Sequence, residues 1–204
     1  MDRLVVFVDY QNTYRLARAA FHDVTTPQRF GHVHPLALGN VLTKLGPYER
    51  ELAQVRAYTG IPDGRKDPRG YGAASRQVAR WRKSGVEVVT RPLRYPQDWP
   101  DCPEGERPEE KGIDVALAID FVMLAIQDKY DVGLLVSCDT DLRPALEVVL
   151  ANTNKRVQVA AWQGAAGRSP RLTLPGANVW CHWMGSDAYA RCGDSTDYGD
   201  PKSN

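Results

Sequence analysis

Short apolar runs alternate along this chain with longer stretches in which apolar residues recur every three or four positions. The first run, Leu4 to Val8, is rich in β-branched residues and stops at Asp9, a pattern typical of a strand buried on both faces of a parallel sheet. Further strands are expected at 51–59, 86–90, 134–136 and 157–161, and helices at 11–20, 36–45, 68–83, 113–126 and 139–150. This alternation predicts an α/β fold with an open, mostly parallel sheet of about five or six strands flanked by helices.

Two segments interrupt the alternation. Segment 92–111 carries five prolines and few aliphatic residues, so we expect a long loop that could act as a lid. The last stretch, 185–204, is rich in Gly, Ser and Asp, which favours a flexible tail. A length of 204 residues fits one folded domain, 1–184, followed by this tail.

The composition excludes some classes of protein. Apolar residues make up 43% and charged residues 25%, as in an ordinary globular protein, and the formal net charge of +1 indicates no polyanionic partner for the whole surface. The four cysteines lack the spacing of a disulfide framework or a zinc cluster. No apolar stretch approaches the roughly 18 residues of a membrane span. We therefore expect a cytoplasmic protein that does not bind membranes.

Acidic residues follow the ends of predicted strands. Asp9 comes directly after the first strand, Asp139 and Asp141 follow the strand at 134–136, and Asp114 lies in the first turn of the helix before that strand. Because the carboxyl ends of parallel strands meet at one edge of a sheet, we expect these four side chains to share a pocket. A plainer interpretation is also open, since an aspartate at these places often caps a helix.

Such a cluster favours a bound cation. Two ionised carboxylates about 5 Å apart repel by roughly 3 kcal/mol at an effective dielectric constant of about 20. Mg²⁺ or Mn²⁺ prefers oxygen ligands and often completes its shell with a substrate phosphate, so the cluster predicts phosphoester chemistry. Lys111 could balance the phosphate charge, and Asn12 and Ser137 could orient the carboxylates. For Asp120, on another face of the same helix as Asp114, we favour a structural hydrogen bond.

Three motifs in this order resemble those of the NYN domain family, which belongs to the PIN-like nuclease superfamily. They are Val6-Phe7-Val8-Asp9-Tyr10-Gln11-Asn12, Lys111-Gly112-Ile113-Asp114 with the helix that follows, and Leu135-Val136-Ser137-Cys138-Asp139-Thr140-Asp141-Leu142. The resemblance spans roughly residues 3 to 161 and implies a Rossmann-like, PIN-type sheet and a metal-dependent endoribonuclease. It places Asp9, Asp114, Asp139 and Asp141 at the acidic centre, and Asn12, Lys111 and Ser137 on motif positions. The chain departs from the usual motif at Cys138, where glycine is common, and at Tyr10-Gln11.

Basic residues are concentrated between Asp63 and Arg94, a segment that contains nine Lys and Arg residues and only three acidic residues. We expect this region to contact the phosphates of single-stranded RNA through Arg65, Lys66, Arg69, Arg76, Arg80, Lys83 and Arg94. Tyr71, Trp81, Tyr95 and Trp99 are candidates for stacking on unpaired bases. The alternative is a solvated helix face with aromatic residues in the core.

The sequence therefore predicts a divalent-metal-dependent ribonuclease. Two other functions stay open. One is a PIN-like RNA-binding or adaptor module without catalysis. The other is a phosphatase resembling the haloacid dehalogenases, whose nucleophile sits in a strand-then-Asp-x-Asp motif like the one at Asp139. A homodimer is compatible with each function.

Overall fold

The computed structural model describes residues 1–46 and 48–200. The strands are β1 (Asp2–Asp9), β2 (Arg50–Ile61), β3 (Glu87–Pro92), β4 (Val132–Val136), β5 (Arg156–Gly164), β6 (Gly167–Arg168) and β7 (Trp180–Met184). The helices are α1 (Tyr10–Phe21), α2 (Pro35–Lys44), α3 (Pro68–Lys83), α4 (Ile113–Ile126), α5 (Arg143–Asn152) and α6 (Ser186–Cys192), with a 3₁₀ turn, η1 (Thr140–Leu142). All the expected strands and helices are present, whereas β6, β7 and α6 were not expected.

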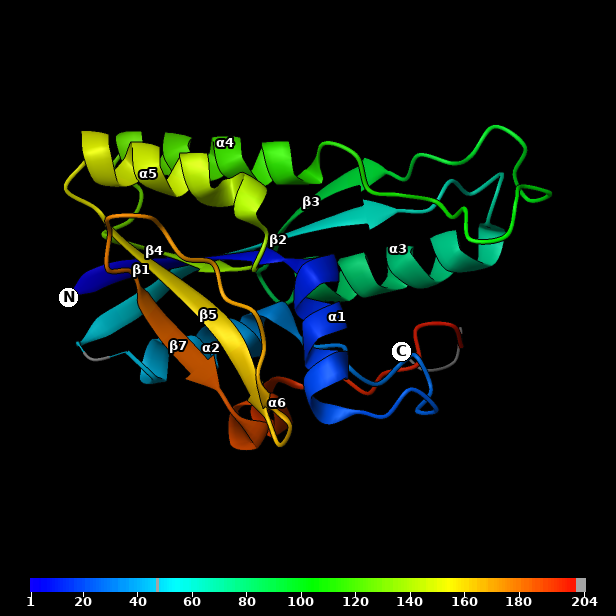
Figure 1. The fold of residues 1–204 in the computed structure, drawn as a ribbon, viewed down its shortest axis with the longest axis horizontal. Helices are drawn as coiled ribbons and strands as arrows, with labels where there is room; N and C mark the ends of the chain where they lie inside the picture. Colours follow the sequence, from blue (N-terminus) through cyan, green and yellow to red (C-terminus); the bar gives the residue numbers. More distant parts are fainter. Residues whose placement is uncertain (47, 201–204) are drawn as a thin grey trace.

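The strands form one mostly parallel sheet in the order β3-β2-β1-β4-β5, with β7 parallel to β5 and the short β6 antiparallel to β5 (Figure 1). From the central strand β1 the chain builds outward to β2 and β3, then crosses over to β4 and builds the other half. The order therefore reverses between β1 and β4, which is where ligands bind in open parallel sheets. This is the predicted Rossmann-like α/β fold.

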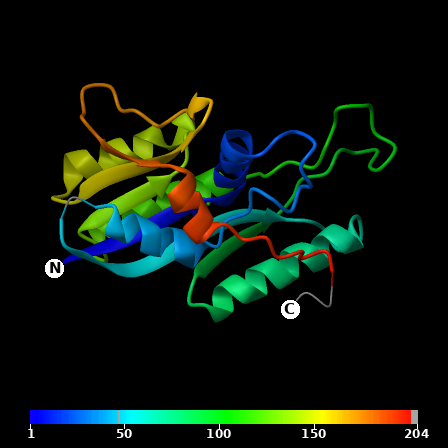
Figure 2. The same cartoon turned by 90° about the horizontal axis from the view of Figure 1, so that it is seen from below.

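Helices cover both faces of the sheet (Figures 1 and 2). Alternate residues of β1 divide between two apolar clusters, with Leu4, Val6 and Val8 in one and Val5 and Phe7 in the other. The first cluster is completed by α1, α2, α3 and α6, and the second by α4 and α5. Burial on both faces explains why the strand reads as an uninterrupted apolar run.

Helix α4 is buried on one side only, although all its residues except Asp114 and Asp120 are apolar. Ile113, Leu117 and Phe121 are fully buried, whereas Val115 is 61% and Ile119 56% exposed. Their spacing of four residues places the exposed side chains on one stripe of the helix. In the part of the chain that the structure describes, neither α4 nor any other helix is long and apolar enough to cross a bilayer.

Residues 185–200 pack against the rest of the domain, which differs from the expectation of a flexible tail from residue 185. Helix α6 buries Ala188 and Cys192 in the cluster shared with α1 and α2, and Tyr198 is only 7% exposed. The guanidinium group of Arg76 in α3 donates to the backbone oxygen of Tyr198 at 2.9 and 2.6 Å. A composition rich in Gly, Ser and Asp hid these few anchoring residues. The end of the expected tail, 201–204, lies outside the described residues.

Residues 93–111, which we call the excursion, leave the sheet after β3 and return to α4 (Figure 2). Their two arms are joined by backbone hydrogen bonds between Arg94 and Glu109, at 2.8 and 2.9 Å. The predicted long loop is therefore a projection with a closed base rather than an open connection.

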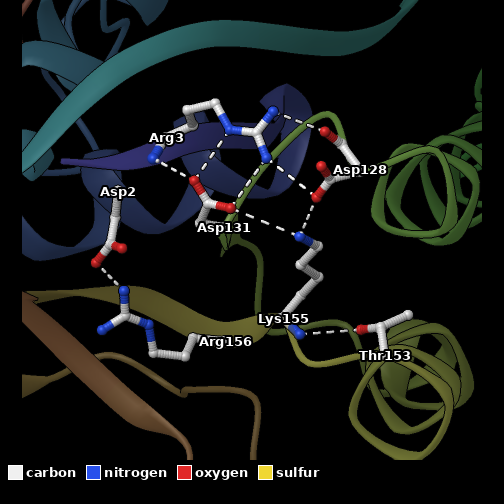
Figure 3. A network of polar contacts seen from close by, with 7 residues as sticks. All are labelled: Asp2, Arg3, Asp128, Asp131, Thr153, Lys155 and Arg156. Atoms are coloured by element: carbon white, nitrogen blue, oxygen red, sulfur yellow. Dashed lines mark hydrogen bonds and ion pairs between the residues drawn. The ribbon is translucent and has the colours of Figure 1, made fainter.

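A polar network joins the strands at the edge opposite their carboxyl ends (Figure 3). Asp131, just before β4, accepts hydrogen bonds from the backbone nitrogen and the guanidinium group of Arg3 in β1, at 2.8 to 3.0 Å. Lys155, just before β5, lies 3.5 Å from the same carboxylate. Pairing with Arg3 holds the pKa of Asp131 well below its usual range. The network fixes the starting points of three neighbouring strands.

Candidate active site at the switch point of the sheet

Asp9 ends the central strand and begins the helix that follows it. Val8 pairs with Val136 of β4, and Asp9 pairs with Tyr58 of β2, so both neighbouring strands hold the end of β1. With no linker before α1, the carboxylate of Asp9 accepts a hydrogen bond from the backbone nitrogen of Asn12 at 3.3 Å and caps the helix. The side chain is only 4% exposed. Capping and burial thus fix its position.

Ser137 and Asn12 connect Asp9 to the loop after β4. The Ser137 hydroxyl donates to Oδ2 of Asp9 at 2.8 Å and accepts from the backbone nitrogen of Asp139 at 3.1 Å. The Asn12 side-chain oxygen accepts from the backbone nitrogen of Cys138 at 3.2 Å. The two turns at the switch point are therefore fastened to each other, and both predicted supporting residues lie beside the carboxylates.

Asp114 and Asp139 face the same cavity as Asp9. Asp114 is the second residue of α4, which begins after Gly112 at a φ of 75°, a left-handed conformation that favours glycine. Asp139 caps η1 by accepting from the backbone nitrogen of Asp141 at 2.9 Å. Asp141 itself is exposed and does not line the cavity. Three of the four predicted carboxylates therefore surround one space, and two of them also cap helices.

The carboxylates form one electrostatic unit. Burial raises the pKa of Asp9 to about 7, helped by the charges of Asp114 and Glu110 and opposed by the hydrogen bonds from Ser137 and Asn12. Burial likewise raises the pKa of Asp114, and the charges of Asp139 and Asp141 raise it further. Asp141 thus acts on the site through its charge, although it lies outside the cavity wall.

The cavity has a volume of about 430 Å³ and includes residues that the sequence did not single out. Glu110, from the excursion, accepts a hydrogen bond from the backbone nitrogen of Gly60 at the end of β2. Burial and the charge of Asp114 raise its pKa, whereas the charge of Arg15 lowers it. Arg15 and Arg107 also line the cavity. Arg15 follows Asn12 by one helical turn, a signal that could have placed it at the site.

Two other predicted residues lie away from the cavity wall. Lys111 is exposed on the segment that leads into α4 and is not among the cavity-lining residues. Asp120 accepts hydrogen bonds from Arg56 at 2.7 Å and from the Tyr58 hydroxyl at 2.9 Å. Asp120 thus has the structural role that was favoured for it.

The basic residues predicted to contact RNA lie on three segments, which are helix α3, the turn before it and the excursion. Arg76, Arg80 and Lys83 surround a shallow cavity on α3 that contains none of the acidic residues, and Arg76 is held by Tyr198. Arg94 lies instead on the excursion, beside a second cavity that adjoins the acidic one. Arg65 pairs with Asp63 at 3.6 Å, Lys66 lies 5.0 Å from the ring centre of Tyr95, and Arg69 is exposed on the first turn of α3.

The aromatic residues proposed for stacking also differ in their surroundings. Trp81 is fully buried and therefore cannot stack on a base, in line with the alternative of a core residue. Tyr71 is 45% exposed on α3. Tyr95 and Trp99 pack edge to face in the excursion, with ring centres 5.4 Å apart.

The donor set at the switch point suits a hard cation, because it consists of carboxylate oxygens with too few positive partners. Burial, with smaller contributions from the charges of Asp114 and Glu110, raises the pKa of Asp9, so ionisation of all these carboxyl groups together is unfavourable without a cation. Among the described residues, however, no group of three or more His, Cys, Asp or Glu side chains is already arranged to hold a metal ion. The oxygen donors therefore suit a hard divalent cation, and a bound ion would need its ligands to move together.

A Rossmann-like parallel sheet with an acidic cavity at its switch point defines a class of α/β domains that includes many phosphoester hydrolases. Residues 3–172 match the sequence profile of the NYN domain. The chain belongs to the NYN domain family, within the PIN-like nuclease superfamily.

No curated protein matches the chain. Among solved structures, a protein of unknown function from Vibrio parahaemolyticus is 24% identical, with a TM-score of 0.48, over 78% of this chain and 80% of the other.

Proposed function

We propose that the protein is a divalent-metal-dependent ribonuclease that cuts phosphodiester bonds within single-stranded RNA. The observation that carries this proposal is the buried carboxyl group of Asp9, whose pKa is raised to about 7 beside Asp114 in a cavity also lined by Asp139. Membership of a nuclease superfamily supports a phosphodiester substrate. The same membership supports RNA as the partner.

Asp9, Asp114, Asp139 and Asp141 are the residues that would hold Mg²⁺ or Mn²⁺. When bound, such an ion supplies a water molecule of lowered pKa and stabilises charge on the phosphate oxygens. Ser137 anchors two of these residues, because its hydroxyl donates to the carboxylate of Asp9 and accepts from the backbone nitrogen of Asp139.

A substrate phosphate would enter a cavity that is also lined by positively charged side chains. Arg15 and Arg107 line it, and their guanidinium groups can donate paired hydrogen bonds to phosphate oxygens. Lys111 is assigned a longer-range role in balancing charge, because it lies outside the wall. The basic residues of α3 and its preceding turn form an outer contact surface for the RNA backbone.

Asp139→Asn tests the proposal directly. Single-stranded RNA labelled at both ends distinguishes internal cuts from trimming, and calorimetric titration measures Mn²⁺ affinity. We expect the substitution to weaken Mn²⁺ binding and abolish cleavage. Asp187→Asn, at an exposed aspartate of α6, is the matched control and is expected to behave as wild type.

Three outcomes would overturn the assignment. Unchanged cleavage by Asp139→Asn excludes Asp139 from the site. Mn²⁺ binding without cleavage by the wild type favours the adaptor. An aspartyl-phosphate trapped on Asp139 favours the phosphatase.

A further inference from the structure

A second cavity, of about 330 Å³, adjoins the acidic one. Gly105, Arg107 and Glu109, all from the excursion, line both cavities, so the two spaces share a wall. The hydrogen bonds between Arg94 and Glu109 close the base of the excursion and fix this wall. Whatever occupies the second cavity therefore lies next to a group bound between the carboxylates.

The lining of the second cavity suits a nucleobase better than a phosphate. Arg94 and Arg107 are donors, Glu106 and Glu109 are acceptors, and Gln97 offers both kinds of group. The formal charges of the two arginines and two glutamates cancel, which gives no net attraction for a polyanion. A nucleobase edge also presents donors and acceptors side by side, and it is uncharged.

These donors and acceptors are available to a ligand. No hydrogen bond or ion pair within the described residues engages the side chains of Arg94, Gln97, Glu106, Arg107 or Glu109. Exposed arginine and glutamate side chains in one small cavity usually pair with each other or with solvent, at little gain in free energy. A ligand edge can therefore compete for them.

Tyr95 provides a fixed aromatic surface in the same cavity. Its hydroxyl oxygen accepts from the backbone nitrogen of Asp63 at 3.2 Å, and Trp99 packs against it edge to face. The ammonium group of Lys66 lies 5.0 Å from its ring centre. Since these contacts come from the excursion and from the turn before α3, the ring is held before any ligand arrives. Stacking of a base on a preorganised ring loses little conformational entropy.

From this geometry we infer that the second cavity binds the base of one unpaired nucleotide, next to the scissile phosphate. Arg107, which lines both spaces, lies between the base and the phosphate that the first cavity would hold. A base in a duplex cannot enter without leaving its stack and its pair, so the pocket selects single-stranded nucleic acid. This inference rests on the proposed function for the position of the scissile phosphate, but its test does not require cleavage.

Binding of a labelled single-stranded RNA hexamer, measured by fluorescence anisotropy in the Asp139→Asn background, tests the inference. Tyr95→Leu removes the ring, whereas Tyr95→Phe keeps it. Arg94→Gln replaces the charged guanidinium group, with its five N–H donors, by a neutral amide with two, and provides a second, independent perturbation of the same cavity. Tyr48→Leu, at an exposed tyrosine near the start of β2, is the matched control. Thermal unfolding of each variant checks that it is folded.

We expect Tyr95→Leu and Arg94→Gln to weaken hexamer binding, the former by about tenfold as for loss of one stacked base. Tyr95→Phe and Tyr48→Leu should bind as the parent does, and the matching RNA duplex should bind at least about tenfold more weakly than the single strand. Equal binding by Tyr95→Leu and its parent, or equal affinity for single strand and duplex, overturns the inference. The proposed function fails separately, if the wild type with Mn²⁺ binds the hexamer but does not cut it.

Discussion

The buried carboxyl group of Asp9 makes the stability of the metal-free protein depend on pH. Its pKa is raised from 3.8 to about 7 in the folded chain, chiefly by burial. Between about pH 4 and pH 7 the folded chain therefore holds a proton that the unfolded chain has released. The free energy of unfolding consequently falls as the pH rises through this range, and it levels off above pH 7. Asp9→Asn removes the ionisation and keeps the shape of the side chain.

The magnitude follows from the shift. A change from 3.8 to about 7 corresponds to about 4 kcal/mol. Asp9 accepts from Ser137 and from the backbone of Asn12 with its two oxygens, whereas asparagine has only one acceptor oxygen. The loss of one of these hydrogen bonds reduces the gain in stability by about 1 kcal/mol. We therefore expect Asp9→Asn to raise the free energy of unfolding by about 3 kcal/mol at pH 8 in a chelating buffer. Near pH 4, where the folded wild type is protonated, it should change little.

Urea unfolding at several values between pH 4 and pH 8 measures this effect. Asp131→Asn is a control of opposite sign, because Arg3 holds the pKa of Asp131 below its usual range. Its carboxylate stabilises the fold above the unfolded pKa, and the contribution is lost as the pH falls. If Asp9→Asn is no more stable than wild type at pH 8, or if both show the same pH dependence, the account of Asp9 is refuted. Added Mn²⁺ should raise the stability of the wild type at pH 8 much more than that of Asp9→Asn.

Three further substitutions separate supporting from structural roles. Ser137→Ala removes the donor to Asp9 and should weaken Mn²⁺ binding about tenfold by calorimetry; unchanged affinity would remove Ser137 from the site. Asp120→Asn should lower the free energy of unfolding by about 1 kcal/mol, measured with urea, because it weakens the pairing with Arg56, while the cleavage rate per folded molecule stays the same. Cys138→Ser should retain metal-dependent RNA cleavage, and loss of turnover without loss of Mn²⁺ affinity would point to a chemical role for the thiol.

The alternating sheet and helices could be predicted because the burial of each element leaves a local pattern. The strand at Leu4 to Val8 is apolar at every position because both faces of the sheet are covered. Strand β7 escaped prediction because Trp180 at its start is 54% exposed, and His182 is buried within it through a hydrogen bond to Gln158. Burial of a polar residue by a partner 24 positions away leaves no sign in the local pattern.

The residues of the candidate site that follow strand ends could be predicted, whereas those that come from the excursion could not. Asp9 and Asp139 follow strand ends, and their positions depend only on the local strand and the parallel sheet. Glu110 and Arg107 reach the cavity because the excursion folds back on itself, a long-range event that depends on pairing between Arg94 and Glu109. The tryptophan at position 81 looked available to RNA because a mixed basic and aromatic helix does not reveal which of its faces meets the core.

The direction of the Asp9 side chain depends on the number of residues in β1. Side chains alternate between the two faces of a strand, and Asp9 lies two positions after Phe7 and four after Val5. Its side chain therefore points to the same face as theirs, toward the layer that contains α4 and Asp114. Both faces of this strand accept aliphatic residues, so a one-residue deletion between Leu4 and Val8 would still leave an acceptable apolar strand. Such a deletion would nevertheless turn the carboxylate toward the opposite layer. Exchange of one aliphatic residue for another of similar volume would leave the direction of the terminal acid unchanged, whereas a one-residue change in the length of the strand would reverse it.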